Sequence, residues 1–380
     1  MALTKRYVTS AGAGAGTGLL SDFSDAMSWA AMITDLNTPH AGYKYVVKGN
    51  VANTTTSTTL TGDGTTTSPI IIEGCFATEG DMLTNGRNSD GTLNTTGFPV
   101  ISYTGSTARF IASGANNLII RCLTITAESS NLACHLGAGA EAQRCRLVNS
   151  GTNSASYAVG GSAASIGVFD CDVETALTGT TAAVQFTGGF WHIEGCRIKC
   201  APGNGISCVA GGVAKNNTIY ECTVGIATTD TASAPLILNN TIVNCTGNGI
   251  DIITGTTGLT TIIGNSITGC GGYGIDFNSS TCVKRLGYNR FRDNTSGDIN
   301  GGGDWEEGTS ILNVTTDSGS TATNDAIDFT DVSNDDYSLK AGAPQTSKGI
   351  GHLIDIGAHG SPVVIAGGGP LSGPGRLVRN

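Results

Sequence analysis

Two aspartates of the sequence have the spacing of a paired-carboxylate site. Asp251 and Asp276 each follow a Gly-Ile pair and stand 25 residues apart. If the chain repeats with this period, strand alternation turns both carboxylates outward, while the neighbouring isoleucines point inward. Stacked carboxylates can share a proton, bind calcium, or act as an acid and a nucleophile on a glycosidic bond. The alternative interpretation is a solvated face without chemistry.

Other residue types in the sequence are candidates for holding a sugar. The segment after Asp276 supplies four cations that suit an acidic sugar: Lys284, Arg285, Arg290 and Arg292. Trp191 and His192 are candidates for a carbohydrate platform, with packing as the alternative. A second outward patch is predicted from the carboxylates Asp170, Asp172 and Glu174, near Glu194 of the following coil. The five histidines lack metal-site spacing, so no cofactor is expected apart from calcium at the aspartates.

The composition excludes several classes of protein. The chain has 380 residues, of which 56 are glycine, and only 13% are charged. Helical bundles, collagen and disordered chains do not have this composition. A net charge of −10 argues against nucleic acid as a partner. No apolar run reaches the length of a membrane span, and no apolar stretch follows the basic N-terminal residues, so neither membrane insertion nor a secretory signal is expected.

A repeat of about 24 residues organises the chain. Its anchor column consists of Cys122, Cys145, Cys171 and Cys196, continued by Asn217, Asn240, Asn265 and Asn289. Apolar residues recur three positions before this anchor and two positions after it. A period this short suits one coil of a solenoid whose parallel strands stack about 4.8 Å apart. We expect the asparagines to hydrogen-bond along a ladder, and the Gly of each recurring Gly-Ile pair to supply a positive φ.

The repeat units resemble those of the right-handed parallel β-helix, or pectate-lyase-like, superfamily. The matching segments are "NNTIYECTVGI", "NNTIVNCTGNGI" and "GNSITGCGGYGI". The resemblance implies an all-β fold, a single-stranded right-handed parallel β-helix of roughly 10–13 coils with an N-terminal capping helix. The family's polygalacturonase-type motifs, Asn-Thr-Asp, Asp-Asp and Gly-His-Gly, are absent. Whether the chain is an enzyme therefore stays open at this point, with a non-enzymatic role preferred.

Three regions are predicted along the chain. Residues 1–45 form an N-terminal cap with an amphipathic helix over 21–36, which begins at Ser21. Residues 46–360 form the β-helix, whose coils are clearest over 115–295. Residues 361–380 form a Gly/Pro-rich, flexible C-terminal tail.

The resemblance implies several functions, because the fold carries enzymes, adhesins and viral spikes. The preferred prediction is a structural virion protein of a bacteriophage or related virus: a spike, fibre or capsid-decoration subunit. Twelve cysteines in stacked columns predict buried reduced thiols, which suit assembly in a host cytoplasm. The expected partners are further copies of the chain, with a trimer favoured, or a capsid or tail lattice, together with surface polysaccharide. The alternatives are a polysaccharide lyase or glycoside hydrolase acting on an acidic polysaccharide, which is extracellular, and a bacterial surface adhesin.

Overall fold

The computed structural model describes most of the first 301 residues and three short segments beyond them. The described residues are 3–38, 41–88, 90–105, 109–112, 114, 116–128, 132–151, 157–175, 181–209, 211–229, 235–253, 259–278, 283–287, 289–301, 316–317, 329–331 and 336–339. The predicted C-terminal tail and Cys282 lie outside these ranges.

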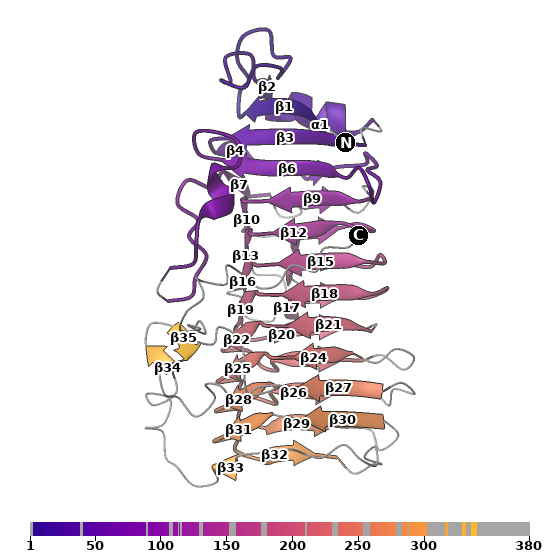
Figure 1. Cartoon of the computed structure of the whole chain (residues 1–380), viewed down its shortest axis with the longest axis vertical. Helices are drawn as coiled ribbons and strands as arrows, with labels where there is room; N and C mark the ends of the chain where they lie inside the picture. The colour runs from indigo at the N-terminus through magenta and orange to yellow at the C-terminus, as the bar shows by residue number, and fades with distance from the viewer. Residues whose placement is uncertain are drawn as a thin grey trace, which may run out of the picture.

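Within the ranges given above, three long sheets run along the molecule, each built from parallel strands that stack coil upon coil (Figure 1). Sheet A has 12 strands in the order β2 (Met27–Ser28), β1 (Thr4–Thr9), β3 (Tyr43–Lys48), β6 (Ile70–Cys75), β9 (Leu118–Arg121), β12 (Glu141–Gln143), β15 (Ile166–Phe169), β18 (Trp191–Glu194), β21 (Gly212–Lys215), β24 (Leu236–Leu238), β27 (Leu259–Ile263) and β30 (Val283–Gly287). Sheet B has 11 strands in the order β33 (Thr316–Asp317), β31 (Arg290–Arg292), β28 (Ser266–Thr268), β25 (Thr241–Val243), β22 (Thr218–Tyr220), β19 (Arg197–Cys200), β16 (Asp172–Thr175), β13 (Arg146–Asn149), β10 (Thr124–Ala127), β7 (Val100–Tyr103) and β4 (Val51–Thr54). Sheet C has 10 strands in the order β32 (Gly297–Asn300), β29 (Tyr273–Phe277), β26 (Ile250–Ile252), β23 (Ile226–Thr228), β20 (Asn204–Cys208), β17 (Ala182–Phe186), β14 (Tyr157–Gly161), β11 (Leu132–Leu136), β8 (Phe110–Ala112) and β5 (Thr58–Thr59).

Each coil of the solenoid contributes one strand to each sheet. The chain passes from sheet A to sheet B and then to sheet C, as in β18, β19 and β20, before it returns to sheet A one coil further along. Neighbouring strands of all three sheets pair in parallel, and β34 (Phe329–Asp331) and β35 (Asp336–Leu339) form a separate antiparallel pair. The predicted all-β parallel solenoid is therefore confirmed.

Strand alternation separates the core from the surface. In β18, Trp191 and Ile193 are buried in the interior, whereas His192 and Glu194 face outward and are partly exposed. The same alternation in the other strands joins the inward side chains into one continuous apolar cluster from Val8 to Phe291. Burial of apolar surface along the whole axis is the main stabilising term of such a solenoid.

The turn from sheet A to sheet B contains the predicted asparagine ladder. The carbonyl oxygen Oδ1 of Asn240 accepts hydrogen bonds from the backbone N–H and the amide of Asn217, both at 3.0 Å. The Asn240 amide in turn donates to Ala214 O at 3.0 Å and to Asn265 Oδ1 at 3.0 Å. Polar backbone groups at a buried turn are thus satisfied from coil to coil, as expected.

Cysteine takes the place of asparagine in the earlier coils of this ladder. The thiol of Cys171 donates to Ala142 O at 3.5 Å and accepts from the backbone N–H of Cys145 at 3.4 Å. The thiol of Cys196 makes the same kind of bond to Val168 O at 3.4 Å. All cysteines within the described residues are buried and carry free thiols, which agrees with the predicted buried, reduced state.

The recurring glycines before the sheet C strands have a different role from the predicted one. Gly225, Gly249 and Gly274 do not adopt a positive φ. A Cβ atom on Gly249 would lie 2.7 Å from Gly274 O of the next coil and 2.4 Å from the Ile267 side chain. The column therefore exists because consecutive coils approach too closely for any side chain. Positive φ occurs instead just before the ladder position, as at Asn216 and Asn239.

We expect Gly249→Ala to lower the free energy of unfolding by about 1–3 kcal/mol, the usual cost of overpacking a tight interior. The added methyl group would clash with the backbone carbonyl oxygen of Gly274, which cannot rotate away as a flexible side chain could. Gly86→Ala is the matched control, because no atom lies within 4 Å of the Cβ it would add. Urea unfolding of both variants measures the difference. Equal midpoints for the two variants would contradict the close-approach explanation.

The N-terminal end of the solenoid is closed by the helix α1 (Trp29–Leu36), which is shorter than predicted. Its N-cap is Ser28, whose hydroxyl accepts a hydrogen bond from the backbone N–H of Ala31 at 3.1 Å, so the predicted start at Ser21 is wrong. Residues 27–28 instead form β2, which pairs with β1 and extends sheet A. The predicted apolar stripe is confirmed in part, because Trp29, Met32 and Leu36 are buried against the end of the core.

Candidate functional site

The two candidate aspartates lie side by side on sheet C. Asp251 is the central residue of β26, and its partner in the adjacent strand β29 is Asp276. The flanking isoleucines Ile250 and Ile275 are fully buried in the core, so both carboxylates project from the outer face. Asp251 is partly exposed, whereas Asp276 is only 8% exposed. We refer to Asp251 and Asp276 as the carboxylate pair.

Asparagine amides hold the carboxylate pair in place. The two oxygens of Asp276 accept hydrogen bonds from Asn248 at 3.0 Å and from Asn300 at 2.9 Å. Asp251 accepts one from the Asn278 amide at 2.5 Å. Burial, and secondly the negative charge of Asp276, raise the pKa of Asp251 to about 6. Asp251 thus retains a proton in weakly acidic solution, while Asp276 accepts hydrogen bonds from two amides.

The raised pKa of Asp251 predicts a pH-dependent stability. Because the folded state holds this proton more tightly than the unfolded chain, the contribution of Asp251 is greatest below pH 4 and is lost as the pH rises through about 6. We therefore expect Asp251→Asn to gain in Tm relative to the wild type between pH 5 and pH 8. Asp22→Asn, which changes an exposed carboxylate of the N-terminal cap, should show no such trend in this range. Parallel curves for Asp251→Asn and wild type would contradict the raised pKa.

The four predicted sugar-binding cations do not lie beside the carboxylate pair. Lys284 and Arg285 belong to β30 of sheet A, and Arg290 and Arg292 belong to β31 of sheet B, whereas the pair lies on sheet C. Arg290 and Arg292 are also buried, at 2% and 4% exposure. The expectation that these cations join the carboxylate pair is wrong because the chain turns between strands, so residues close in sequence belong to different sheets.

The predicted carbohydrate platform of Trp191 and His192 does not exist. The Trp191 side chain is fully buried in the core. His192 points the opposite way, as alternation along a strand requires. Its Nε2 atom lies 3.0 Å from Glu194 Oε2, and its ring packs edge-on against Phe169 at 5.0 Å. These two side chains therefore cannot stack on one sugar.

The second predicted carboxylate patch is neutralised by arginines. Arg87 Nη1 is 2.8 Å from Asp172 Oδ1, and Arg146 Nη2 is 3.5 Å from Glu174 Oε2. Asp170 lies 3.7 Å from Arg87 and occupies the turn before β16 rather than the strand. Glu194 belongs to sheet A, a different face from Asp172 and Glu174. The carboxylates are thus parts of ion pairs, and the predicted acidic cluster is not formed.

A loop that was not predicted from the sequence covers part of sheet B. This covering loop (residues 85–88 and 90–95) reaches across several coils, and its contacts fix it there. Asp172 accepts hydrogen bonds from Arg87 Nη1 at 2.8 Å and from the backbone N–H of Leu93 at 2.6 Å. Arg87 Nη2 donates to Gly195 O at 2.7 Å. The loop thereby forms one wall above the otherwise flat outer face of sheet B.

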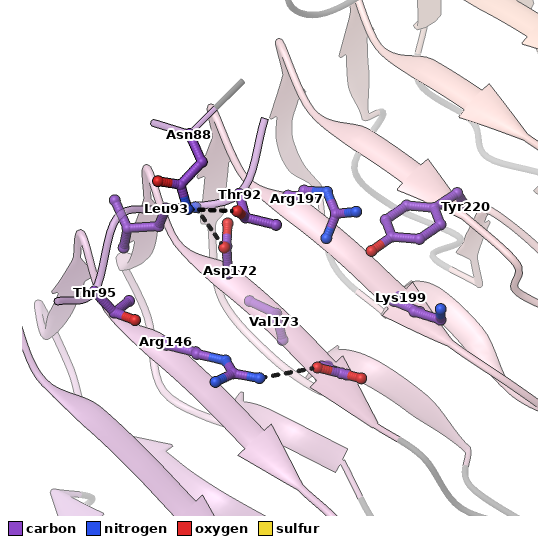
Figure 2. A pocket seen from close by; sticks show the side chains of 11 residues that line it. Asn88, Thr92, Leu93, Thr95, Arg146, Asp172, Val173, Arg197, Lys199 and Tyr220 are labelled. Atoms are coloured by element: carbon purple, nitrogen blue, oxygen red, sulfur yellow. Dashed lines mark hydrogen bonds and ion pairs between the residues drawn. The ribbon is translucent and has the colours of Figure 1, made fainter. Parts of the chain in front are cut away.

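A polar groove lies between the covering loop and sheet B (Figure 2). Its volume is about 280 Å³, and its lining residues are Asn88, Thr92, Leu93, Thr95, Arg146, Asp172, Val173, Glu174, Arg197, Lys199 and Tyr220. We call this feature the sheet B groove. Its floor comes from the outward positions of β13, β16, β19 and β22 on successive coils.

Cations and an aromatic ring form the far side of the sheet B groove. The guanidinium of Arg197 lies over the Tyr220 ring at 4.5 Å from its centroid, and Lys199 Nζ is 5.4 Å from the same centroid. These contacts give Tyr220 a fixed position between two positive charges. Arg197 and Lys199 alternate with the buried Ile198, so the alternation of basic and apolar residues in "CRIKC" is a sequence signal for this outward face.

Two further observations concern ligands and membranes. Within the described ranges, no group of three or more His, Cys, Asp or Glu side chains is arranged to hold a metal ion. Calcium at the carboxylate pair therefore stays a prediction from the sequence. None of the helices in the described part of the chain is long and apolar enough to cross a membrane.

Comparison with known proteins identifies the family to which this fold belongs. The family model described as "right handed beta helix region" matches residues 132–327. The chain is similar in structure to a pectate lyase, Pel9A, with a TM-score of 0.63 and 13% sequence identity. That similarity covers 94% of this chain and 96% of the pectate lyase, and at this identity it concerns the fold alone. No curated protein matches the sequence. The family match covers more than half of the chain, which therefore belongs to the right-handed β-helix family.

Proposed function

We propose that this protein is a glycoside hydrolase that cleaves a polysaccharide at the carboxylate pair of sheet C. The observation that carries the proposal is the direct pairing of Asp251 with Asp276, together with the raised pKa of Asp251. Carboxyl groups whose environments separate their protonation states commonly act as the acid and the nucleophile in glycoside hydrolysis with retention. The β-helix fold is compatible with this chemistry, although fold alone does not establish it.

We assign one role to each carboxyl group. Asp251 keeps a proton in weakly acidic solution and donates it to the glycosidic oxygen as the bond to the anomeric carbon breaks. Asp276, oriented by Asn248 and Asn300, forms a bond to that carbon as a carboxylate. Water then displaces Asp276 and returns a proton to Asp251. Strands about 4.8 Å apart favour the shorter carboxyl separation of the retaining mechanism.

Hydrolysis suits the site better than elimination by a lyase. A lyase acting on an acidic sugar needs a basic group and positive charge beside the uronate carboxylate. The hydrogen-bond partners described for the carboxylate pair are asparagines, and the predicted cations lie on sheets A and B. A general acid beside a carboxylate is what hydrolysis requires.

The proposal is tested by incubating the protein at pH 5 with a panel of neutral and acidic polysaccharides. We expect reducing ends to appear with at least one of them, and unsaturated products, which absorb in the ultraviolet, to be absent. The double variant Asp251→Asn/Asp276→Asn serves as the control preparation. Reducing ends released equally by the double variant would overturn the assignment, and unsaturated products would indicate a lyase instead.

A structural role on a virion surface is the second candidate. Its support is the set of buried free thiols along the core, since such thiols suit a protein assembled in a reducing cytoplasm. Spike and fibre subunits form closed, symmetric oligomers. We therefore expect light scattering after gel filtration to give the mass of three 38.4 kDa chains. A monomeric mass would count against this candidate, while leaving hydrolysis by a single chain unaffected.

A further inference from the structure

We propose that the sheet B groove binds an acidic saccharide unit, such as a uronate residue, at a site separate from the carboxylate pair. The groove is bounded by strands β13 to β22 of sheet B, and the carboxylate pair lies on β26 and β29 of sheet C. The two sites thus occupy different faces and different coils of the rod (Figure 1). The inference therefore goes beyond the proposed hydrolysis and does not depend on it.

The groove is a built feature, because buried polar contacts hold its wall. Asp172, which is only 9% exposed, accepts from Arg87 and from the Leu93 backbone, and Arg87 also donates to Gly91 O at 2.7 Å. These bonds join residues of the covering loop to a strand about 80 positions later in the sequence. A wall fixed in this way provides a preformed site, which lowers the entropic cost of binding.

The charges of the groove favour an anionic group on the ligand. Three cations, Arg146, Arg197 and Lys199, line it, although the chain as a whole carries a net charge of −10. Of the two lining carboxylates, Asp172 already accepts from the covering loop through both oxygens. Glu174 is therefore the carboxylate that faces the groove, 3.5 Å from Arg146.

Neighbouring carboxylates moderate this positive charge. Glu221 Oε2 is 3.0 Å from Lys199 Nζ, and Asp90 of the covering loop lies close enough to Arg197 for their charges to interact. A small inorganic anion, which has no hydroxyl groups, would use only part of the lining. The lining instead combines cations, a carboxylate, an amide and hydroxyl groups, which can donate to and accept from sugar hydroxyls as well as hold a carboxylate.

The size of the groove fits the same class of ligand. A volume of about 280 Å³ lies at the lower end of small-molecule sites, which suits one sugar residue or two. Figure 2 shows the side chains of Arg197, Lys199 and Tyr220 along one side and those of Asn88 and Thr92 on the other. We assign the uronate carboxylate to Arg197 and Lys199, and the ring hydroxyls to Glu174, Asn88 and Thr92.

Saturation-transfer NMR on the full chain tests the proposal with sodium D-galacturonate as the probe. We expect saturable binding, and at least a tenfold weaker affinity in Lys199→Gln and in Arg197→Gln. Lys5→Ala, which removes an exposed cation of the N-terminal strand, should bind like the wild type. Asp251→Asn should also bind normally, and this separates failure here from failure of the proposed hydrolysis.

Two further ligands distinguish the chemistry of the site. Neutral D-galactose should bind at least tenfold more weakly than galacturonate, and sodium sulfate should not displace galacturonate at equal concentration. Equal binding of galactose, full displacement by sulfate, or unchanged affinity in folded Lys199→Gln would each overturn the proposal. Thermal unfolding shows whether each variant is folded. If Arg197→Gln is destabilised by the loss of the contact with Tyr220, Lys199→Gln alone provides the test.

Discussion

Asp251→Asn is expected to slow the hydrolysis of a polysaccharide substrate by about 10²–10⁴-fold, the usual contribution of a general acid. The amide that replaces the Asp251 carboxyl group can still accept the hydrogen bond from Asn278 through its oxygen. It cannot, however, donate a proton to the leaving oxygen. The rate of the wild type should also fall as the pH rises above about 6, because Asp251 then loses its proton. The variant should lose this limb of the pH profile. Initial rates of reducing-end release between pH 4 and pH 8 measure both effects.

Asp276→Asn should lower the rate at least as much, because it removes the carboxylate that attacks the anomeric carbon. It should also bring the pKa of Asp251 back toward its ordinary value, since it removes a neighbouring negative charge. Asp22→Asn is the matched control, as it makes the same chemical change on an exposed surface of the cap. A wild-type rate in folded Asp251→Asn would contradict the catalytic assignment.

The second large effect concerns the asparagine ladder. Asn240→Leu is expected to lower the free energy of unfolding by about 2–6 kcal/mol, because at least two buried backbone groups lose their partners at about 1–3 kcal/mol each. These groups are the N–H of Asn217 and the carbonyl of Ala214. A leucine of similar volume fills the space but cannot accept or donate a hydrogen bond.

The matched control for the ladder is Asn116→Ala. Asn116 is exposed, and its amide donates to Asp63 Oδ1 at 2.8 Å on the surface. Water replaces such a bond, so we expect a change below about 1 kcal/mol. Chemical denaturation followed by circular dichroism gives both values. A loss for Asn240→Leu no greater than for Asn116→Ala would show that the ladder is not required for stability.

The fold could be predicted from the sequence because its stabilising contacts repeat at a fixed interval. Asn217, Asn240 and Asn265 appear as a column in the sequence because they contact one another in the structure. Parts of the fold that do not repeat leave no such column in the sequence, so they were harder to predict. Ser28 rather than Ser21 caps α1, because residues 27–28 first complete a strand of sheet A. That pairing is a tertiary contact without a local signal.

The candidate site was predictable only where a single sheet was involved. Register alone placed Asp251 against Asp276. The grouping of Arg290 with this pair failed, since it required knowing where each coil turns. The burial of Trp191 followed from the apolar position of Ile193 two residues later, and this signal was present in the sequence. By contrast, the hydrogen bond from Arg87 to Gly195 O joins residues 108 positions apart, and no local sequence pattern predicts it.

A carbon-13 NMR titration of the Asp251 carboxyl group directly tests whether this residue is the general acid. Spectra of the wild type and of Asp251→Asn, both labelled on aspartate, identify the resonance. We expect an apparent pKa of about 6 in the wild type and a lower value in Asp276→Asn, because the charge of Asp276 contributes to the shift. A value near 4 that Asp276→Asn leaves unchanged would show that the stacked carboxylates do not act as an acid and a nucleophile.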